Sequence, residues 1–390
     1  MNGAKTTILL EGHHIRPDGN KGDELMLHTV MRRLRAADEN VRLAVDPRMG
    51  SFIDRTRLGL YQALWPFSAM RLSTSAGYLV LQRYAETFGI VPESEVDWVL
   101  NFQGYRYADI GLHETRKDLA AARRRTKSGG TQYIYLPQAF GPFSDRALRK
   151  AAYELFSMAR LICARDEQSR EHLLDIGLPP SVVEVFPDIT ITETVHTAEA
   201  GSREEPVVCV IPNIWMIERT DRAQSEAYVD FLVFVCREVQ RRGLVPRLVN
   251  HAPFQDGPIA KRVADEVGGN VEVVCQGDPR QVKATIGKSM FVVGSRYHAL
   301  VAALSQSVPA IGTSWAHKYE TLYDDYGCPE LLLSAAAPRT TILATIDRLL
   351  DSRSTTGLKK QLDDHNLFLK SRVEDVWTKV HAMIGLPSKS

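Results

Sequence analysis

The sequence lacks the features of several large classes of protein. No run in its 390 residues reaches the roughly 20 consecutive apolar residues of a membrane-spanning helix. The first apolar run, TTILL, is too short for a signal peptide and precedes no cleavage pattern. The formal net charge is only +1, so no overall field attracts nucleic acid or an anionic membrane. Nucleic acid is therefore not an expected partner.

Cysteine is also scarce. The five cysteines are odd in number, lie far apart and include no CxxC pair, which disfavours a zinc site and a disulfide framework. No DxD metal motif, GxGxxG fingerprint or P-loop pattern occurs either. We expect a reduced, cytoplasmic protein with no metal-binding residues and no resident cofactor, while the metal dependence of its reaction stays open.

Short apolar runs alternate with amphipathic stretches along most of the chain, which favours parallel sheets covered by helices on both faces. The polar segment 196–206 is the best domain boundary. The prediction is an α/β protein with two Rossmann-like domains, 1–196 and 206–355, facing a cleft at the carboxyl ends of their strands. The tail, 356–390, should form a helix whose apolar face packs back on the body; that face comprises Leu362, Leu367, Val373, Val376 and Val380.

The stretch GSRYHALVAALSQSVPAIG, residues 294–312, carries two cationic side chains at the expected start of a helix. With Ser295 as the N-cap, Arg296 and His298 would lie in the first turn, where cations are disfavoured. A bound anion would offset their repulsion, and the planar fork of arginine suits a carboxylate or phosphate. The plain structural alternative pairs Arg296 with an aspartate across the domain boundary and packs His298 as a neutral cap.

Polar residues follow other predicted strands, and each also has an ordinary structural explanation. Asn20, in the glycine-rich loop GNKGDELML, either faces a substrate or belongs to a well-capped loop. Gln138 follows Pro137, which should end its strand, and is either a binding group or an exposed turn residue. Lys318, in WAHKYETLYDDYG, adds a further positive group unless it is a solvated surface lysine.

Two more strand ends carry charge. Arg165 stands at the tip of the run RLICA, where it either binds an anion or pairs with a nearby carboxylate such as Glu167. Asp166 is placed to cap the following helix. Asp188, in VFPDITI, is either functional or a turn carboxylate. An anion held by several of these cations is the hypothesis that the residues alone support.

Six segments, in order, resemble the polysaccharide pyruvyl transferase family: GNKGDELML, LPQAFGPF, ARDEQSREHLLDIGL, VFPDITI, GSRYHALVAALSQSVPAIG and WAHKYETLYDDYG. The resemblance implies a fold of the glycosyltransferase-B kind. It also implies transfer of a pyruvyl group from phosphoenolpyruvate to two hydroxyls of a sugar, with a cyclic ketal and phosphate as products. Ala139, Phe140 and Tyr297 depart mildly from the residues usual in the family.

In the family, the positions that match Arg165, Arg296, His298 and Lys318 are associated with donor binding and catalysis. We expect His298 to deliver a proton to C3 of the donor, and the two arginines to clamp its carboxylate and phosphate. Lys318 should stabilise the departing phosphate. The base that deprotonates the hydroxyls is open, with Glu24 and Asp188 as candidates.

The resemblance leaves the acceptor open between lipid-linked sugars, nucleotide-linked sugars and polysaccharides, and a lipid-linked acceptor would allow a peripheral membrane contact. The acceptor is expected on the N-terminal domain, where Tyr61 and Trp65 could stack on a sugar or simply pack in the core. The donor is expected on the C-terminal domain. Two alternatives stay open: a nucleotide-sugar-dependent glycosyltransferase on the same fold, and a non-catalytic sugar- or anion-binding relative.

Overall fold

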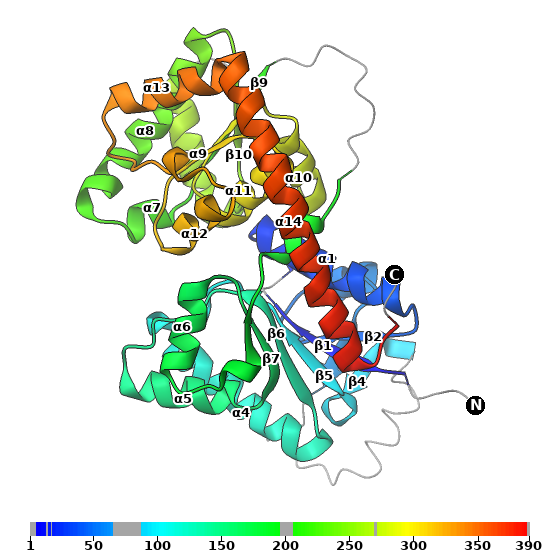
Figure 1. Ribbon diagram of the computed structural model, residues 1–390. Coiled ribbons are helices and arrows are strands. Elements are labelled where there is room, and N and C mark those ends of the chain that lie inside the picture. Colours follow the sequence, from blue (N-terminus) through cyan, green and yellow to red (C-terminus); the bar gives the residue numbers. More distant parts are fainter. Residues whose placement is uncertain are drawn as a thin grey trace. The chain divides into compact units, whose positions relative to one another are not determined.

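The computed structural model describes residues 5–12, 15–16, 18–64, 87–195, 206–268 and 271–387 (Figure 1). The chain divides into two compact units. Unit 1 comprises Met1–Arg16, Met26–Asp188 and Glu374–Ser390, and unit 2 comprises Pro17–Leu25 and Ile189–Val373. The boundary predicted at 196–206 falls almost entirely outside the described residues. The residues at 17–25, which the sequence assigned to the N-terminal domain, group with unit 2 instead.

The described part of unit 1 holds a parallel sheet with the strand order β4-β3-β2-β1-β5-β6-β7-β8. Its strands are β1 (Thr7–Glu11), β2 (Arg42–Val45), β3 (Tyr61–Leu64), β4 (Ile90–Pro92), β5 (Trp98–Asn101), β6 (Gln132–Gln138), β7 (Ala159–Ala164) and β8 (Val183–Val185). Its helices are α1 (Lys21–Ala37, begun in unit 2), α2 (Phe52–Arg57), α4 (Leu112–Gly129), α5 (Arg146–Phe156) and α6 (Glu167–Asp175), with short 3₁₀ turns η1 (Glu93–Glu95), η2 (Asp109–Gly111) and η3 (Pro180–Val182).

Local chemistry explains these elements. Asp145 caps α5 by accepting hydrogen bonds from two backbone N–H groups of the first turn, and the helix then buries residues at helical spacing. Phe156, at its end, lies edge-on to the rings of Tyr107, Tyr135 and Phe140 at 5.0–5.3 Å between centroids. These aromatic pairs add to the stabilisation from buried apolar area, and they fasten α5 to the sheet.

Strand β6 corrects the prediction that Pro137 ends its strand. The strand continues to Gln138. Its pairing with β7 shifts register between Tyr135 and Gln138, and this irregularity accommodates a residue that has no N–H to donate. Strands β3 and β4 lie within residues 50–95, where the sequence predicts no particular element.

Unit 2 has a second parallel sheet, with the strand order β11-β10-β9-β12-β13 in the described residues. Its strands are β9 (Val207–Ile211), β10 (Val245–Val249), β11 (Glu272–Val274), β12 (Val292–Gly294) and β13 (Ala310–Gly312). Its helices are α7 (Trp215–Glu218), α8 (Arg222–Arg241), α9 (Pro253–Val267), α10 (Pro279–Gly287), α11 (Tyr297–Leu304), α12 (Lys318–Asp325) and α13 (Arg339–Leu350), with 3₁₀ turns η4 (Ile189–Thr192) and η5 (Pro329–Leu331). Helices α8 and α9 pack side by side, as do α10 and α11.

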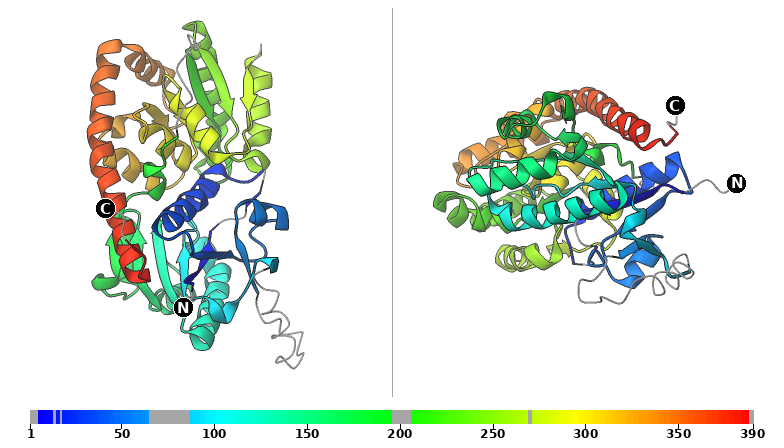
Figure 2. Two further views of the ribbon diagram at one scale, coloured as in Figure 1. Left: turned by 90° about the vertical axis from the view of Figure 1, so that its right-hand side faces the viewer. Right: turned by 90° about the horizontal axis from the view of Figure 1, so that it is seen from below.

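The chain ends in one long helix, α14 (Ser352–Ile384), which is continuous in both views of Figure 2. Its residues as far as Val373 belong to unit 2, and those from Glu374 belong to unit 1, so the tail is not a unit of its own. The predicted apolar face is buried except for Leu367, which is 74% exposed. Including Leu367 was therefore wrong; Leu369, which is buried, takes its place on that face.

Candidate functional site

In unit 2 the strand order reverses between β9 and β12. The chain leaves β9 toward one edge of the sheet and later returns to build β12 and β13 on the other side. Ligands of open α/β sheets bind beyond the carboxyl ends of the strands at such a reversal. Here the segments that leave these two strand ends touch, because the side-chain amide of Asn213 donates to the carbonyl of Ser295 at 2.6 Å.

Ser295 is the buried centre of the loop after β12. Its hydroxyl lies 2.6 Å from that of Thr313 and accepts a hydrogen bond from Tyr228, while its carbonyl also accepts from the hydroxyl of Tyr319. The prediction that Ser295 caps α11 is therefore wrong. Arg296 is the N-cap residue, its side chain makes no capping bond, and the helix begins at Tyr297. The network instead holds the loop in place and directs Arg296 away from the helix.

Arg296 forms a buried two-pronged ion pair with Asp256 of α9. Its Nε and Nη2 donate to the two carboxylate oxygens at 2.7 Å each, and Nη2 also donates to Gln255 at 2.9 Å. Asp256 is fully buried and accepts a third bond from the backbone N–H of Ile214. An aspartate partner for Arg296 was the structural alternative, but this one lies within the same unit. Among the described residues, nothing accepts a hydrogen bond from Nη1, so this edge of the guanidinium can donate to a ligand.

His298 follows in the first turn of α11 and is largely buried. Its Nδ1 lies 3.8 Å from a carboxylate oxygen of Asp23. A Cβ atom added at Gly22 would stand 2.3 Å from Cβ of His298, closer than non-bonded atoms approach, so only glycine fits there. The glycine-rich segment thus fixes the position of the histidine ring.

Lys318 begins α12 and is not the solvated lysine of the structural alternative, since it is only 8% exposed. Its Nζ lies 4.6 Å from the ring centroid of Trp315, 5.5 Å from Tyr297 and 5.8 Å from Tyr319. Aromatic faces attract a cation at these distances. The ring of Tyr297 also contacts His298 edge-on, so it joins Lys318 to the start of α11.

The segment before α1 belongs to the same group of residues. Asn20 caps the helix, because its Oδ1 accepts from the backbone N–H of Gly22 at 3.0 Å, while its Nδ2 has no partner among the described residues. Lys21 is buried and pairs with Glu24 at 2.8 Å. The backbone N–H of Lys21 donates to the carbonyl of His251. Unit 2 therefore brings together Asn20, Glu24, Arg296, His298 and Lys318 of the predicted site.

Three residues of this group were missed from the sequence: Lys21, His251 and Asp256. His251 follows β10, is 3% exposed, and has a pKa well below the usual range, first because of burial and then because of the charges of Arg296, His298 and Lys21. The signal was present in VPRLVNHAPFQDG, where a polar pair and then an acid follow an apolar strand. The pairing of that acid with Arg296 leaves no sequence pattern.

The remaining predicted residues lie in unit 1. Arg165 pairs with Asp188 at 3.2 Å, and both side chains are buried, so the expected pairing of Arg165 with a nearby carboxylate is present; the carboxylate is Asp188, whereas the example named, Glu167, pairs with Arg170. Asp166 caps α6 as expected. These contacts are local to unit 1. Binding roles for Arg165 and Asp188 stay predictions.

Gln138 is not the exposed turn residue of the structural alternative. It is fully buried at the end of β6, where its Nε2 donates to the carbonyl and side-chain oxygens of Asn101 and its Oε1 accepts from the backbone N–H of Gln103. All these bonds join β6 to the end of β5. The structure therefore gives Gln138 a role in holding two strand ends together.

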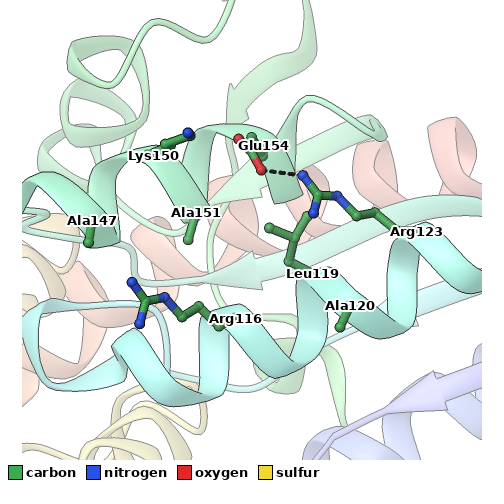
Figure 3. Close-up of a pocket in the computed structure, with 8 residues that line it drawn as sticks. All are labelled: Arg116, Leu119, Ala120, Arg123, Ala147, Lys150, Ala151 and Glu154. Atoms are coloured by element: carbon green, nitrogen blue, oxygen red, sulfur yellow. Dashed lines mark hydrogen bonds and ion pairs between the residues drawn. The ribbon is translucent and has the colours of Figure 1, made fainter.

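The described part of unit 1 includes two surface hollows that lie away from the carboxyl ends of its strands. One, of about 340 Å³, lies between α4 and α5: Ala120, Ala147 and Ala151 leave space there, and Arg116 and Lys150 stand at its rim (Figure 3). Another, of about 350 Å³, is bordered by Tyr61. Trp65, named with Tyr61 as a residue that could stack on a sugar, lies outside the described residues.

The described residues contain no cluster of three or more His, Cys, Asp or Glu side chains suited to a metal ion. In the same part of the chain, no helix has the length and apolar character needed to cross a membrane.

The comparison with protein families matches residues 20–317 to the model for polysaccharide pyruvyl transferase, which is about three quarters of the chain. The chain belongs to this family. The match includes every residue of the predicted site except Lys318, which directly follows its end. No curated protein matches the chain.

Solved structures with the same fold include glycosyltransferases and epimerases. A putative UDP-N-acetylglucosamine 2-epimerase from Listeria monocytogenes shares 13% identity and covers 98% of this chain and 97% of its own, with a TM-score of 0.61. HepE of Anabaena, in complex with UDP-glucose, shares 12% identity, with 97% and 99% covered and a TM-score of 0.56. The MnaA–UDP structure from S. aureus shares 12% identity and covers 92% of this chain and 90% of its own, with a TM-score of 0.55. The predicted glycosyltransferase-B class of two parallel-sheet α/β domains is confirmed.

Proposed function

We propose that this family member transfers a pyruvyl group from phosphoenolpyruvate to two hydroxyls of one sugar. The observation that carries the proposal is the gathering of Arg296, His298 and Lys318 at the strand reversal of unit 2, in a chain whose net charge is only +1. Phosphoenolpyruvate carries a carboxylate and a phosphate on three carbons, so it needs several cations in a small space. Family membership independently supports a pyruvyl transferase.

The proposed reaction has two steps. In the first, a sugar oxygen bonds to C2 of phosphoenolpyruvate, C3 receives a proton from His298, and the hydroxyl proton leaves to a base. In the second, the other hydroxyl bonds to C2, the bond from C2 to the phosphate oxygen breaks, and phosphate departs with the second hydroxyl proton. The result is a cyclic ketal and inorganic phosphate.

The contacts of the three cations suggest different roles. The Nε edge of Arg296 is occupied by Asp256, so we assign only Nη1 to the donor; the fixed pair then serves to orient that edge. Lys318, held among aromatic rings, would stabilise the charge on the departing phosphate. Asn20 and Glu24 belong to the same cluster of residues in unit 2, where Nδ2 of Asn20 would donate a hydrogen bond to the substrate. Glu24 stays a candidate base, together with Asp188 of unit 1. We keep Arg165 as a second anion-binding residue for the same reaction.

The second candidate is a glycosyltransferase that uses a nucleotide sugar, because HepE, with the same fold, binds UDP-glucose. A phosphate group of such a donor would also suit a helix start with cations. The acceptor in either case is a sugar, lipid-linked, nucleotide-linked or part of a polysaccharide.

Calorimetric titration of the full chain distinguishes the two. We expect phosphoenolpyruvate to bind the wild type and to bind Arg296→Gln at least about tenfold more weakly, the loss typical of a hydrogen bond to a charged group. Arg262→Gln is the matched control, since Arg262 lies on the exposed face of α9 and pairs with Glu266. Binding of UDP-glucose with none of phosphoenolpyruvate would overturn the proposal. Phosphate release on adding a glycan acceptor would exclude a non-catalytic relative.

A further inference from the structure

His251 lies at the proposed donor site but has no part in the reaction described so far. It follows β10, the strand beside β9 at the centre of the sheet. Its backbone carbonyl accepts a hydrogen bond of 3.0 Å from the N–H of Lys21, the first residue of α1. The backbone of His251 is therefore joined to the glycine-rich segment at the start of α1.

The end of β10 contains two adjacent polar side chains with unsatisfied buried atoms. Nδ1 of His251 and Oδ1 of Asn250 are both inaccessible to solvent, and neither has a hydrogen-bond partner among the described residues. Burying a polar atom without a partner costs free energy, so native structures avoid it where nothing else requires it. Two such atoms on neighbouring residues indicate a place that a polar ligand completes.

The charges around the ring are mainly positive. Lys21 approaches from α1, and Arg296 and His298 approach from α11; all three charges lower the pKa of His251, in addition to burial, which has the larger effect. The carboxylate on the neighbouring helix, Asp256, is engaged by Arg296 and Ile214. Glu24 pairs with Lys21, and Asp23 lies near His298. The imidazole is thus neutral at pH 7 in this structure.

We propose that His251 is an additional donor-binding residue that takes up one proton when phosphoenolpyruvate enters the site. The negative charges of the donor would oppose the positive charges of Lys21, Arg296 and His298. Protonated Nδ1 of His251 would then donate a hydrogen bond to the donor. The proton comes from the solvent and forms the N–H bond at Nδ1 of His251, while no bond of the donor breaks. This inference rests on the proposed function and deepens it, because it makes donor affinity depend on pH: binding weakens as the pH rises and protonating His251 becomes harder.

The test is proton uptake during binding of phosphoenolpyruvate to the full chain. Calorimetry in two buffers of different ionisation enthalpy gives the number of protons taken up per donor bound. We expect the wild type to take up nearly one proton more than His251→Gln near pH 7. We also expect the dissociation constant of the variant to be roughly tenfold or more above that of the wild type at pH 6, with a smaller ratio at pH 8.

His381→Gln is the matched control. His381 is also buried, carries a ring nitrogen without a partner among the described residues and has a lowered pKa, but it lies in the part of α14 that belongs to unit 1. It should bind the donor with the uptake of the wild type. His298→Gln shows which histidine is responsible, since it should keep most of the uptake even where it loses turnover.

The outcomes separate the inference from the proposed function. Donor binding with equal uptake in the wild type and His251→Gln would overturn the role of His251 and leave the function standing. No donor binding to the wild type would overturn both. If His251→Gln does not fold, ¹³C-histidine NMR spectra of the wild type and His298→Gln decide between the outcomes. One imidazole signal that moves from the neutral to the charged position when the donor is added supports the inference. The absence of such a change refutes it.

Discussion

Replacing Asp256 with alanine is expected to destabilise unit 2 strongly. Asp256 is fully buried and accepts two hydrogen bonds of 2.7 Å from Arg296 and one of 2.9 Å from the N–H of Ile214. Without the carboxylate, the guanidinium stays buried with an unbalanced charge, and the Ile214 N–H loses its acceptor. Removing one partner of a buried ion pair costs about 3–5 kcal/mol.

The magnitude converts into a melting temperature. For a unit of this size, each kcal/mol changes the midpoint by roughly 2–4 °C, so Asp256→Ala should lower it by roughly 6–20 °C. Asp256→Asn keeps an oxygen for Ile214 but turns an N–H toward Arg296, so we expect a smaller loss of about 2–4 kcal/mol.

Scanning calorimetry of the full chain measures both effects. Asp265→Ala is the matched control, because Asp265 lies on the same helix and pairs with Lys261 while exposed to solvent. Exposed pairs at this spacing contribute about 0.3–0.5 kcal/mol, and the control should melt within about 2 °C of the wild type. If Asp256→Ala and Asp265→Ala melted at the same temperature, the argument that Asp256 balances Arg296 would be refuted.

Three further predictions follow from single contacts. Gly22→Ala places a methyl group against His298, so calorimetry should show a loss of about 1–3 kcal/mol, and an alanine variant as stable as the wild type would contradict this packing. Burial and the nearby charge of Glu11 raise the pKa of Asp118 to about 6, so its favourable contribution to the free energy of unfolding is present below pH 4 and lost as the pH rises through 6. The stability of Asp118→Asn relative to the wild type should therefore rise by up to about 3 kcal/mol between pH 4 and pH 8. A stability difference independent of pH would contradict the raised pKa. Leu362→Ala should cost about 2–5 kcal/mol in chemical denaturation and Leu367→Ala within about 0.5 kcal/mol, whereas equal losses would show that the helix buries a different face.

The sequence predicts the sheets well because their strands are buried on both faces. The runs around Val207–Ile211 and Val292–Gly294 are apolar throughout, which is typical of central parallel strands. The sequence does not predict strands β3 and β4, because Tyr61–Leu64 and Ile90–Pro92 are short and Tyr61–Leu64 mixes polar with apolar residues. Composition and periodicity carry too little signal for strands of this kind.

The candidate site was only partly predictable, for a different reason. Each strand-end residue can be located in the sequence, but its partner cannot. Asp256 lies 40 positions from Arg296, and the aromatic rings around Lys318 follow from the fold of α11 and α12. From the sequence, Gln138 is either a binding group or an exposed turn residue, because the contact of its amide with Asn101 leaves no sequence pattern. Burial and pairing, which distinguish a binding group from a structural one, appear only in three dimensions.

A crystal structure of the protein with phosphoenolpyruvate bound would test the central claim most directly. The account predicts donor density in unit 2 beyond the ends of β9 and β12, with an anionic group accepting a hydrogen bond from Nη1 of Arg296. It also predicts Lys318 beside the phosphate and His298 beside C3. Ordered donor elsewhere on the chain, or a nucleotide sugar in this place while phosphoenolpyruvate fails to bind, would contradict it.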